Sequence, residues 1–165
     1  MITTIEPSVE AELERILGEY AAACSPKLAG GIIMDPKSGE IVAMGVVPSF
    51  DPNAFNEVEG TAVFKNPHVE SVFEMGSIIK PLTVAAALDA GTIVESSVYN
   101  DTGCITLDEK KLCNFDLKAR GTVPVQEILS QSLNVGSAYL ATKMGQETFN
   151  EYFLQRYKLG AETGI

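Results

Sequence analysis

A serine and a lysine three residues apart, directly before a run of small apolar residues, constrain this chain most. The sequence reads E-M-G-S-I-I-K-P over residues 74–81 and L-T-V-A-A-A-L over residues 82–88. If Ser77 begins a helix, this spacing places Lys80 on the same helical face. The small residues let that helix lie in a core, where burial lowers the pKa of a lysine and frees its amine as a base. The pattern therefore predicts a serine nucleophile activated by Lys80.

A second pair of polar residues, Ser132 and Asn134, lies in L-S-Q-S-L-N-V-G over residues 129–136. A hydroxyl and an amide separated by one residue can project from a loop into one cleft. The alternative is ordinary helix capping, which both residue types do well.

Five segments of the sequence, which follow one another in the family's order, resemble the transpeptidase domain of the class B penicillin-binding proteins. S-x-x-K and S-x-N are two of the active-site motifs that the penicillin-binding proteins share with class A β-lactamases. The middle residue of S-x-N is more often serine in the family, and here it is Leu133. The segments that carry the resemblance are T-I-E-P (4–7), G-I-I-M-D-P-K-S-G-E-I-V-A-M (31–44), F-D-P-N (50–53), F-E-M-G-S-I-I-K-P (73–81) and S-L-N-V-G (132–136).

The third motif, K-T-G, does not occur in the sequence. E-T-G at residues 162–164 resembles it, but a glutamate stands where the cation should be, so we interpret it as a decoy. In the family, T-G-I begins a segment well before the K-T-G strand. We therefore expect residues 1–165 to be a partial transpeptidase domain.

The resemblance implies an α+β fold of the serine β-lactamase and transpeptidase type, here incomplete. It implies a helix and a β-hairpin over about residues 1–50 and an all-helical active-site subdomain over about residues 66–165, without the C-terminal sheet strands. Periodicity predicts a helix from Glu6 or Ser8 to about Ser25, then apolar strands over about 29–35 and 40–47 with both faces covered. Further helices are expected over about 77–90, from 121 to near 132, and over about 135–144 and 146–157.

The resemblance also implies a function, that of a peptidoglycan D,D-transpeptidase. Ser77 would attack the carbonyl of a D-alanyl-D-alanine stem peptide, and Lys80 would be its base. Ser132 would relay a proton to the leaving amine, and Asn134 would bind Lys80 and the substrate amide. Ser77, Ser132 and Asn134 are thus also the expected substrate-binding residues. β-Lactam antibiotics would trap Ser77 as an acyl-enzyme, and neither a metal nor a cofactor is implied.

The resemblance further implies a parent protein on the extracytoplasmic face of a bacterial membrane, working with other cell-wall synthesis proteins. Relatives carry a membrane anchor and a pedestal domain, and neither is recognisable here. Without the K-T-G strand, we expect the chain alone to be inactive, and to self-associate or to need a second chain. Two alternatives stay open: a β-lactamase or β-lactam sensor of the same fold, and a non-catalytic binding or scaffold module.

The composition of the chain is that of a globular domain and argues against nucleic-acid binding. At 165 residues with 45% hydrophobic content, the chain can build a core. Its formal net charge of −10 argues against nucleic acid as a partner, because nucleic-acid binding requires basic surface.

Three cysteines and one histidine complete the set of reactive side chains. Cys104 and Cys113 flank a predicted short hairpin, where they would form either a disulfide or two reduced thiols. Cys24 ends the first predicted helix and is expected to be buried. His68 is predicted to lie on the surface or at the rim of the site, and a direct catalytic role is the alternative.

Overall fold

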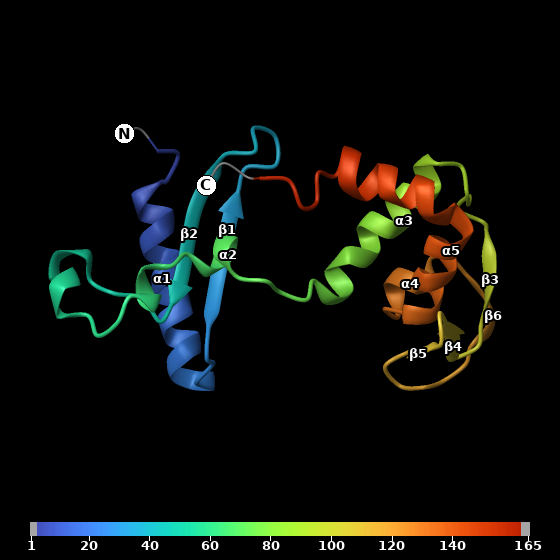
Figure 1. Cartoon of the computed structure of the whole chain (residues 1–165), viewed down its shortest axis with the longest axis horizontal. Helices are drawn as coiled ribbons and strands as arrows, with labels where there is room; N and C mark the ends of the chain where they lie inside the picture. The colour runs from blue at the N-terminus through green and yellow to red at the C-terminus, as the bar shows by residue number, and fades with distance from the viewer. Residues whose placement is uncertain (1–2, 163–165) are drawn as a thin grey trace. The chain divides into compact units, whose positions relative to one another are not determined.

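The chain forms two compact units in a computed structural model that describes residues 3–162 (Figure 1). The first unit extends to Val72 and the second begins at Phe73. The expected division placed the helical part from about residue 66, so the observed boundary lies slightly later in the sequence. The E-T-G decoy has its last two residues outside the described part of the chain.

The first unit is a helix packed against a hairpin. Helix α1 (Pro7–Cys24) is followed by strands β1 (Ala29–Met34) and β2 (Ile41–Val47). The strands pair antiparallel, with Ala29 opposite Val47 and Gly31 opposite Gly45. The predicted turn joins them, and the Asp35 carboxylate accepts a hydrogen bond from the Lys37 amide at 2.7 Å.

Close approach of α1 to the hairpin depends on glycine. A Cβ at Gly45 would lie 3.1 Å from Leu17 and 3.4 Å from Leu13, both on α1. The Glu10 carboxylate of α1 also accepts from the Met44 amide of β2 at 2.8 Å. The helix therefore covers one face of the hairpin by apolar packing and a side-chain bond to the strand backbone.

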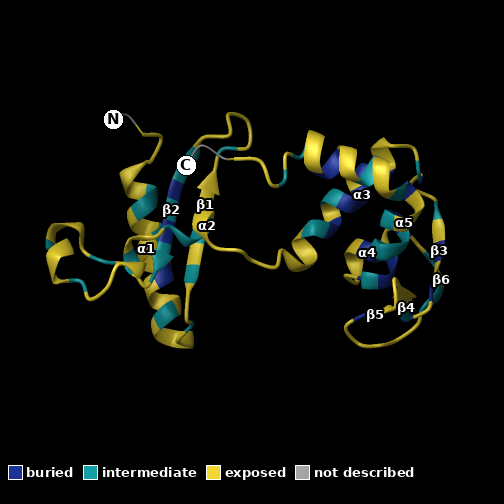
Figure 2. Ribbon diagram, in the orientation of Figure 1, coloured by how far each residue is buried: buried dark blue, intermediate teal, exposed yellow. Residues whose placement is uncertain are grey.

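The hairpin is covered less fully than the sequence predicted. Ile32, Ile33 and Met34 are 45%, 41% and 53% exposed, and most of β1 is coloured as exposed in Figure 2. The physical reason is that the face opposite α1 is contacted by residues 66–68, with His68 beside Gly30 and Asn66 donating to Met44 Sδ at 3.2 Å, while within residues 3–162 no third strand joins the hairpin. Cys24, expected to be buried, is exposed because it lies at the end of α1.

The rest of the first unit is made of short helical turns. They are η1 (Pro52–Glu57), η2 (Ala62–Phe64) and α2 (Pro67–Glu70). Asn66 caps α2 by accepting from the His68 amide at 3.1 Å, and His68 Nε2 lies 2.8 Å from the Gly45 carbonyl oxygen of β2. These contacts give both residues a structural role in this unit.

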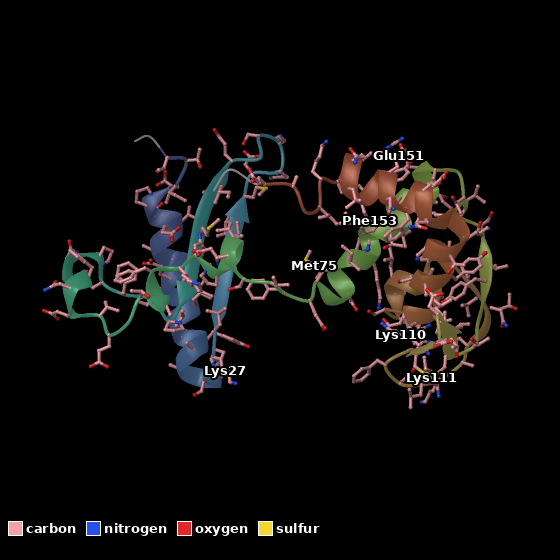
Figure 3. The ribbon with its side chains drawn as sticks, viewed as in Figure 1. Lys27, Met75, Lys110, Lys111, Glu151 and Phe153 are labelled. Carbon is pink, nitrogen blue, oxygen red and sulfur yellow. A yellow bond between two sulfur atoms is a disulfide. The ribbon has the colours of Figure 1, made fainter. Side chains whose placement is uncertain are left out.

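The second unit is built on helices that share one core. They are η3 (Gly76–Ile79), α3 (Lys80–Asp89), α4 (Glu127–Ser130), α5 (Asn134–Asn150) and η4 (Glu151–Arg156), the last a π-helix. Helix α5 is interrupted at Gly145, which has a φ of 78°, close to the predicted gap between two helices. Phe149 stacks on Phe153 with ring centroids 4.1 Å apart, and both residues pack in this core; Phe153 is labelled in Figure 3.

Two small sheets correct the expectation that this part is all helical. Strand β3 (Val98–Asp101) pairs with β6 (Gly121–Pro124), and β4 (Cys104–Leu107) pairs with β5 (Lys110–Cys113). Residues 121–124 were expected to open a helix. They form a strand instead because their partner lies far back in the sequence, at residues 98–101.

Among residues 3–162, no helix is both long enough and apolar enough to cross a membrane.

Gly136 of α5 provides a test of this packing. A Cβ there would lie 2.5 Å from both Ile128 Cγ1 and Tyr99 Oη, which belong to buried residues. We expect Gly136→Ala to lower the free energy of unfolding by about 1–3 kcal/mol, the usual range for overpacking. Chemical denaturation of the second unit measures the change.

The matched control is Gly18→Ala in α1, where a Cβ would meet nothing within 4 Å. There alanine is expected to stabilise the first unit by about 0.5–1 kcal/mol, because glycine is a poor helix former. A Gly136→Ala variant as stable as the parent would contradict the packing described.

Candidate active site

Ser77 and Lys80 meet at the start of the α3 helix. Ser77 lies in η3, a 3₁₀ turn, and residues three apart are eclipsed in that geometry. Lys80 Nζ lies 3.1 Å from Ser77 Oγ and donates to it. Ser77 is exposed, whereas Lys80 is only 6% exposed. A reachable hydroxyl therefore sits against a buried amine.

Ser132 approaches the same amine from the turn between α4 and α5. Its φ of 54° is left-handed, a conformation that is strained for a residue with a Cβ. This conformation turns both its side chain and its carbonyl toward Lys80. Lys80 Nζ donates to Ser132 Oγ at 2.8 Å and to the Ser132 carbonyl oxygen at 2.6 Å. Leu133, only 1% exposed, anchors the turn in the core.

The three side chains form a closed cluster. Ser132 Oγ donates to Ser77 Oγ at 2.9 Å, so each of the two hydroxyls contacts the other and the amine. Burial lowers the pKa of Lys80. None of the ion pairs among the described residues involves Lys80. The neutral amine is thus favoured more than in an ordinary lysine, and it can accept the proton of Ser77.

Asn134 lies beside this cluster but does not bond to Lys80. Its Nδ2 donates to the Cys113 carbonyl oxygen at 2.8 Å, and the structure gives no hydrogen bond between Asn134 and Lys80. The expected contact between the two is therefore absent in this structure. Asn134 does line the same cavity as Ser77 and Lys80.

A cavity of about 530 Å³ opens beside the cluster. It combines the hydroxyl, amine and amide groups with apolar side chains, a usual composition for a ligand site. The apolar part of its wall is formed by Ile79, Leu112, Ala138, Ala141 and Phe149.

The β4–β5 hairpin forms one side of the site. Cys104 and Cys113 are directly opposite each other and are joined by a disulfide. Cys113 holds Asn134 through its carbonyl, and the next residue, Asn114, accepts from the Val135 amide at 3.1 Å. Sequence reasoning missed Asn114, because a single asparagine after a polar hairpin carries no pattern that distinguishes it.

Within the described residues there is no group of three or more His, Cys, Asp or Glu side chains placed to hold a metal ion.

Comparison with known proteins decides the family. The sequence model described as "Penicillin binding protein transpeptidase domain" matches residues 29–165. The chain belongs to the penicillin-binding protein transpeptidase family. This confirms the resemblance drawn from the S-x-x-K and S-x-N motifs, and the α+β transpeptidase-type fold that it implied.

Curated relatives of this transpeptidase domain agree. A peptidoglycan D,D-transpeptidase FtsI homolog of Mesostigma viride is 31% identical over 144 residues, 83% of this chain and 24% of the relative. Stage V sporulation protein D of Bacillus subtilis is 30% identical over 166 residues, covering 100% of this chain and 26% of the relative. Peptidoglycan D,D-transpeptidase FtsI of Escherichia coli is 29% identical over 163 residues, covering 98% and 27%.

A solved structure supports the fold. A crystal structure of a peptidoglycan glycosyltransferase from Burkholderia ambifaria aligns with a TM-score of 0.77 at 22% identity. The alignment covers 92% of this chain and 43% of that one. The chain spans only 24% to 27% of the length of the curated relatives named above.

The lowered pKa of Lys80 predicts how Ser77 reactivity depends on pH. Ser77 Oγ attacks the sulfonyl sulfur and displaces fluoride faster once Lys80 is neutral, so the rate of modification by phenylmethanesulfonyl fluoride should rise with pH. It should level off below the ordinary lysine value of 10.5, since burial lowers the pKa. Intact-mass and peptide mass spectrometry would measure the rate at Ser77.

Two variants are the controls for this pH profile. Lys80→Arg keeps a cation but cannot supply a base, so the rate should fall about a hundredfold or more, as for loss of a general base. Ser77→Ala should remove the modified peptide altogether. Two results would rule out this cluster as the origin of the reactivity. One is a modification rate that is the same in Lys80→Arg as in the parent, and the other is a rate that rises only near pH 10.5 or above.

Proposed function

We propose that the protein containing this chain is a peptidoglycan D,D-transpeptidase in which Ser77 is the nucleophile. The observation that supports this most is the closed cluster of Ser77, Lys80 and Ser132, whose atoms lie 2.8 to 3.1 Å apart. A serine is suited to acyl transfer when its base is a buried amine that forms no ion pair, as is true of Lys80 among the described residues. The curated relatives named as D,D-transpeptidases point to the same chemistry.

In the first half of the proposed reaction, Ser77 Oγ attacks the carbonyl carbon of the penultimate D-alanine. The proton of the Ser77 hydroxyl passes to the neutral amine of Lys80, whose Nζ lies 3.1 Å from Ser77 Oγ. The carbon–nitrogen bond then breaks, and the leaving D-alanine amine takes a proton relayed through the Ser132 hydroxyl. Ser132 fits this relay because its Oγ contacts both Ser77 Oγ and Lys80 Nζ. The product is an ester between Ser77 and the stem peptide.

In the second half, an amine of a neighbouring peptidoglycan strand attacks the ester. The amine loses a proton to Lys80 or Ser132, a new amide forms, and Ser77 leaves with a proton. A β-lactam would enter the first half in the same way. Its ring opening leaves the amine tethered to the acyl group, so the ester to Ser77 persists.

The oxyanion of both steps needs backbone donors. The Ser77 amide is one candidate, because the first N–H groups of a helix have no partner within it. In the family, the other donor and the cation for the substrate carboxylate come from the K-T-G strand. This sequence contains no K-T-G. We propose that a further part of the protein supplies it, and that this chain alone reacts slowly.

The Cys104–Cys113 disulfide bears on where the protein works. Asn134 binds the carbonyl of Cys113, a residue of the disulfide, and disulfides persist in oxidising compartments outside the cytoplasm. Peptidoglycan is assembled in such a compartment. We therefore propose the extracytoplasmic face of a bacterial membrane as the site of action, with peptidoglycan strands and other cell-wall synthesis proteins as partners.

A fluorescent penicillin tests this proposal. The chain alone should be labelled at Ser77 slowly, and adding the K-T-G-carrying part of the protein should raise the rate about a hundred- to a thousandfold. That is the usual effect of one oxyanion-hole donor. Gel fluorescence and peptide mapping would follow the label.

Ser77→Ala is the control and should abolish labelling with or without the added part. Rapid stoichiometric labelling of the isolated chain would refute the need for K-T-G. Labelling at another residue would refute Ser77 as the nucleophile.

A further inference from the structure

We propose that Asn114 is a positioning residue that holds the Ser132 turn against Lys80. This inference rests on the proposed function, because it concerns how the same serine and lysine are kept in reactive geometry. Asn114 itself does not contact Ser77, Lys80 or the Ser132 side chain in the described hydrogen bonds.

Asn114 is a buried amide whose oxygen and nitrogen are both hydrogen-bonded. It is 2% exposed, and its Oδ1 accepts from the Val135 amide at 3.1 Å. Its Nδ2 donates to the two carboxylate oxygens of Asp101 at 2.9 and 3.0 Å, and to the Lys118 carbonyl at 3.2 Å. Because the Nδ2 group faces a carboxylate, Oδ1 has to face the Val135 amide. The orientation of the amide is therefore fixed.

Asp101 holds the Asn114 side chain in place. It is fully buried, and its carboxylate also accepts from the Gly103 and Arg120 amides, both at 3.2 Å. The Arg120 guanidinium lies 3.8 Å from the same carboxylate. A buried carboxylate with this many donors is held in place, so it gives Asn114 a rigid support.

Residues 101–120 also hold the residue that precedes the Ser132–Leu133 turn. Arg120 Nε donates to the Gln131 side-chain oxygen at 2.8 Å, and Gln131 directly precedes Ser132. On the far side, Cys113 and Asn114 hold Asn134 and Val135. Residues on both sides of the Ser132–Leu133 turn are thus tied to residues 101–120, a segment that supplies no side chain to the cluster itself.

Ser132 needs such support because its backbone is strained. Its left-handed φ of 54° brings both its oxygens to Lys80, and strain of this kind persists only where surroundings impose it. If Gln131 and Val135 lose these hydrogen bonds, the backbone of Ser132 can leave this conformation. The Ser132 hydroxyl then moves away from the Lys80 amine. A displacement of about 1 Å in such a site can slow a reaction by about a hundredfold.

A double-mutant cycle tests the inference. Asn114→Asp places a second carboxylate against Asp101 and should slow modification of Ser77 by phenylmethanesulfonyl fluoride about tenfold or more. In an Asp101→Asn background, the same change restores a donor–acceptor pair. It should then alter the rate by less than about threefold. Near-UV circular dichroism would establish that each variant is folded.

Ile93→Ala is the matched control, because Ile93 is a core residue of the same unit at 3% exposure and bonds to none of these side chains. It should destabilise the unit but leave the Ser77 rate of the folded protein unchanged. An Asn114→Asp variant that is folded and reacts at the parent rate would overturn the inference. So would an Ile93→Ala variant that is slowed as much as Asn114→Asp.

A second readout separates this inference from the proposed function. The nuclear Overhauser effect between Lys80 Hε and Ser132 Hβ protons reports their approach without any reaction. Asn114→Ala should weaken it, whereas Ile93→Ala should not. If the chain supplemented with the K-T-G-carrying part of the protein does not react at Ser77, the proposed function fails, and the positioning role is then tested by this signal alone.

Discussion

Among the described residues the Lys80 amine is buried without a carboxylate partner, and the rest of the site depends on this constraint. An exposed lysine would stay protonated near neutral pH, and a lysine paired with a carboxylate would be held in its charged form. Here the amine is surrounded by two hydroxyls and one backbone carbonyl. None of these three acceptors carries a charge, so none offsets the effect of burial as a carboxylate would, and burial lowers the pKa of the amine.

Each neighbouring element serves this arrangement in a definite way. The 3₁₀ turn at Gly76–Ile79 eclipses Ser77 with Lys80, while the small residues of α3 let the lysine lie in the core. The left-handed Ser132 supplies two of the three acceptors, and Leu133 anchors its turn. The segment from β3 to β6 then fixes the flanks of that turn through Asp101, Asn114 and Arg120.

Local patterns in the sequence predicted the parts of this site that are encoded over a few residues. S-x-x-K and S-x-N gave Ser77, Lys80, Ser132 and Asn134, and the geometry brings the first three into contact. Helix α1, the β1–β2 hairpin and the Cys104–Cys113 hairpin were also predicted, because amphipathic period and turn residues are local signals. The catalytic roles of these residues remain predictions that the experiments above address.

What the sequence did not predict depends on contacts between distant residues. Residues 121–124 form a strand only because residues 98–101 lie beside them, which no local propensity reveals. Asn134 bonds to Cys113 instead of Lys80 because the disulfide-bonded hairpin lies against the start of α5. Asn114 was missed for the same reason, since its role arises from Asp101 and Val135, which are far from it in sequence.

Direct titration of Lys80 tests the central claim, that burial makes its amine available as a base. Selective ¹³Cε labelling of lysine, with Lys80→Arg to assign the resonance, would give its pKa by nuclear magnetic resonance. The structure predicts a pKa below 10.5, the ordinary value, because burial disfavours the charged amine. A pKa at or above 10.5 would contradict the account, since Lys80 would then be an ordinary cation and not the base for Ser77.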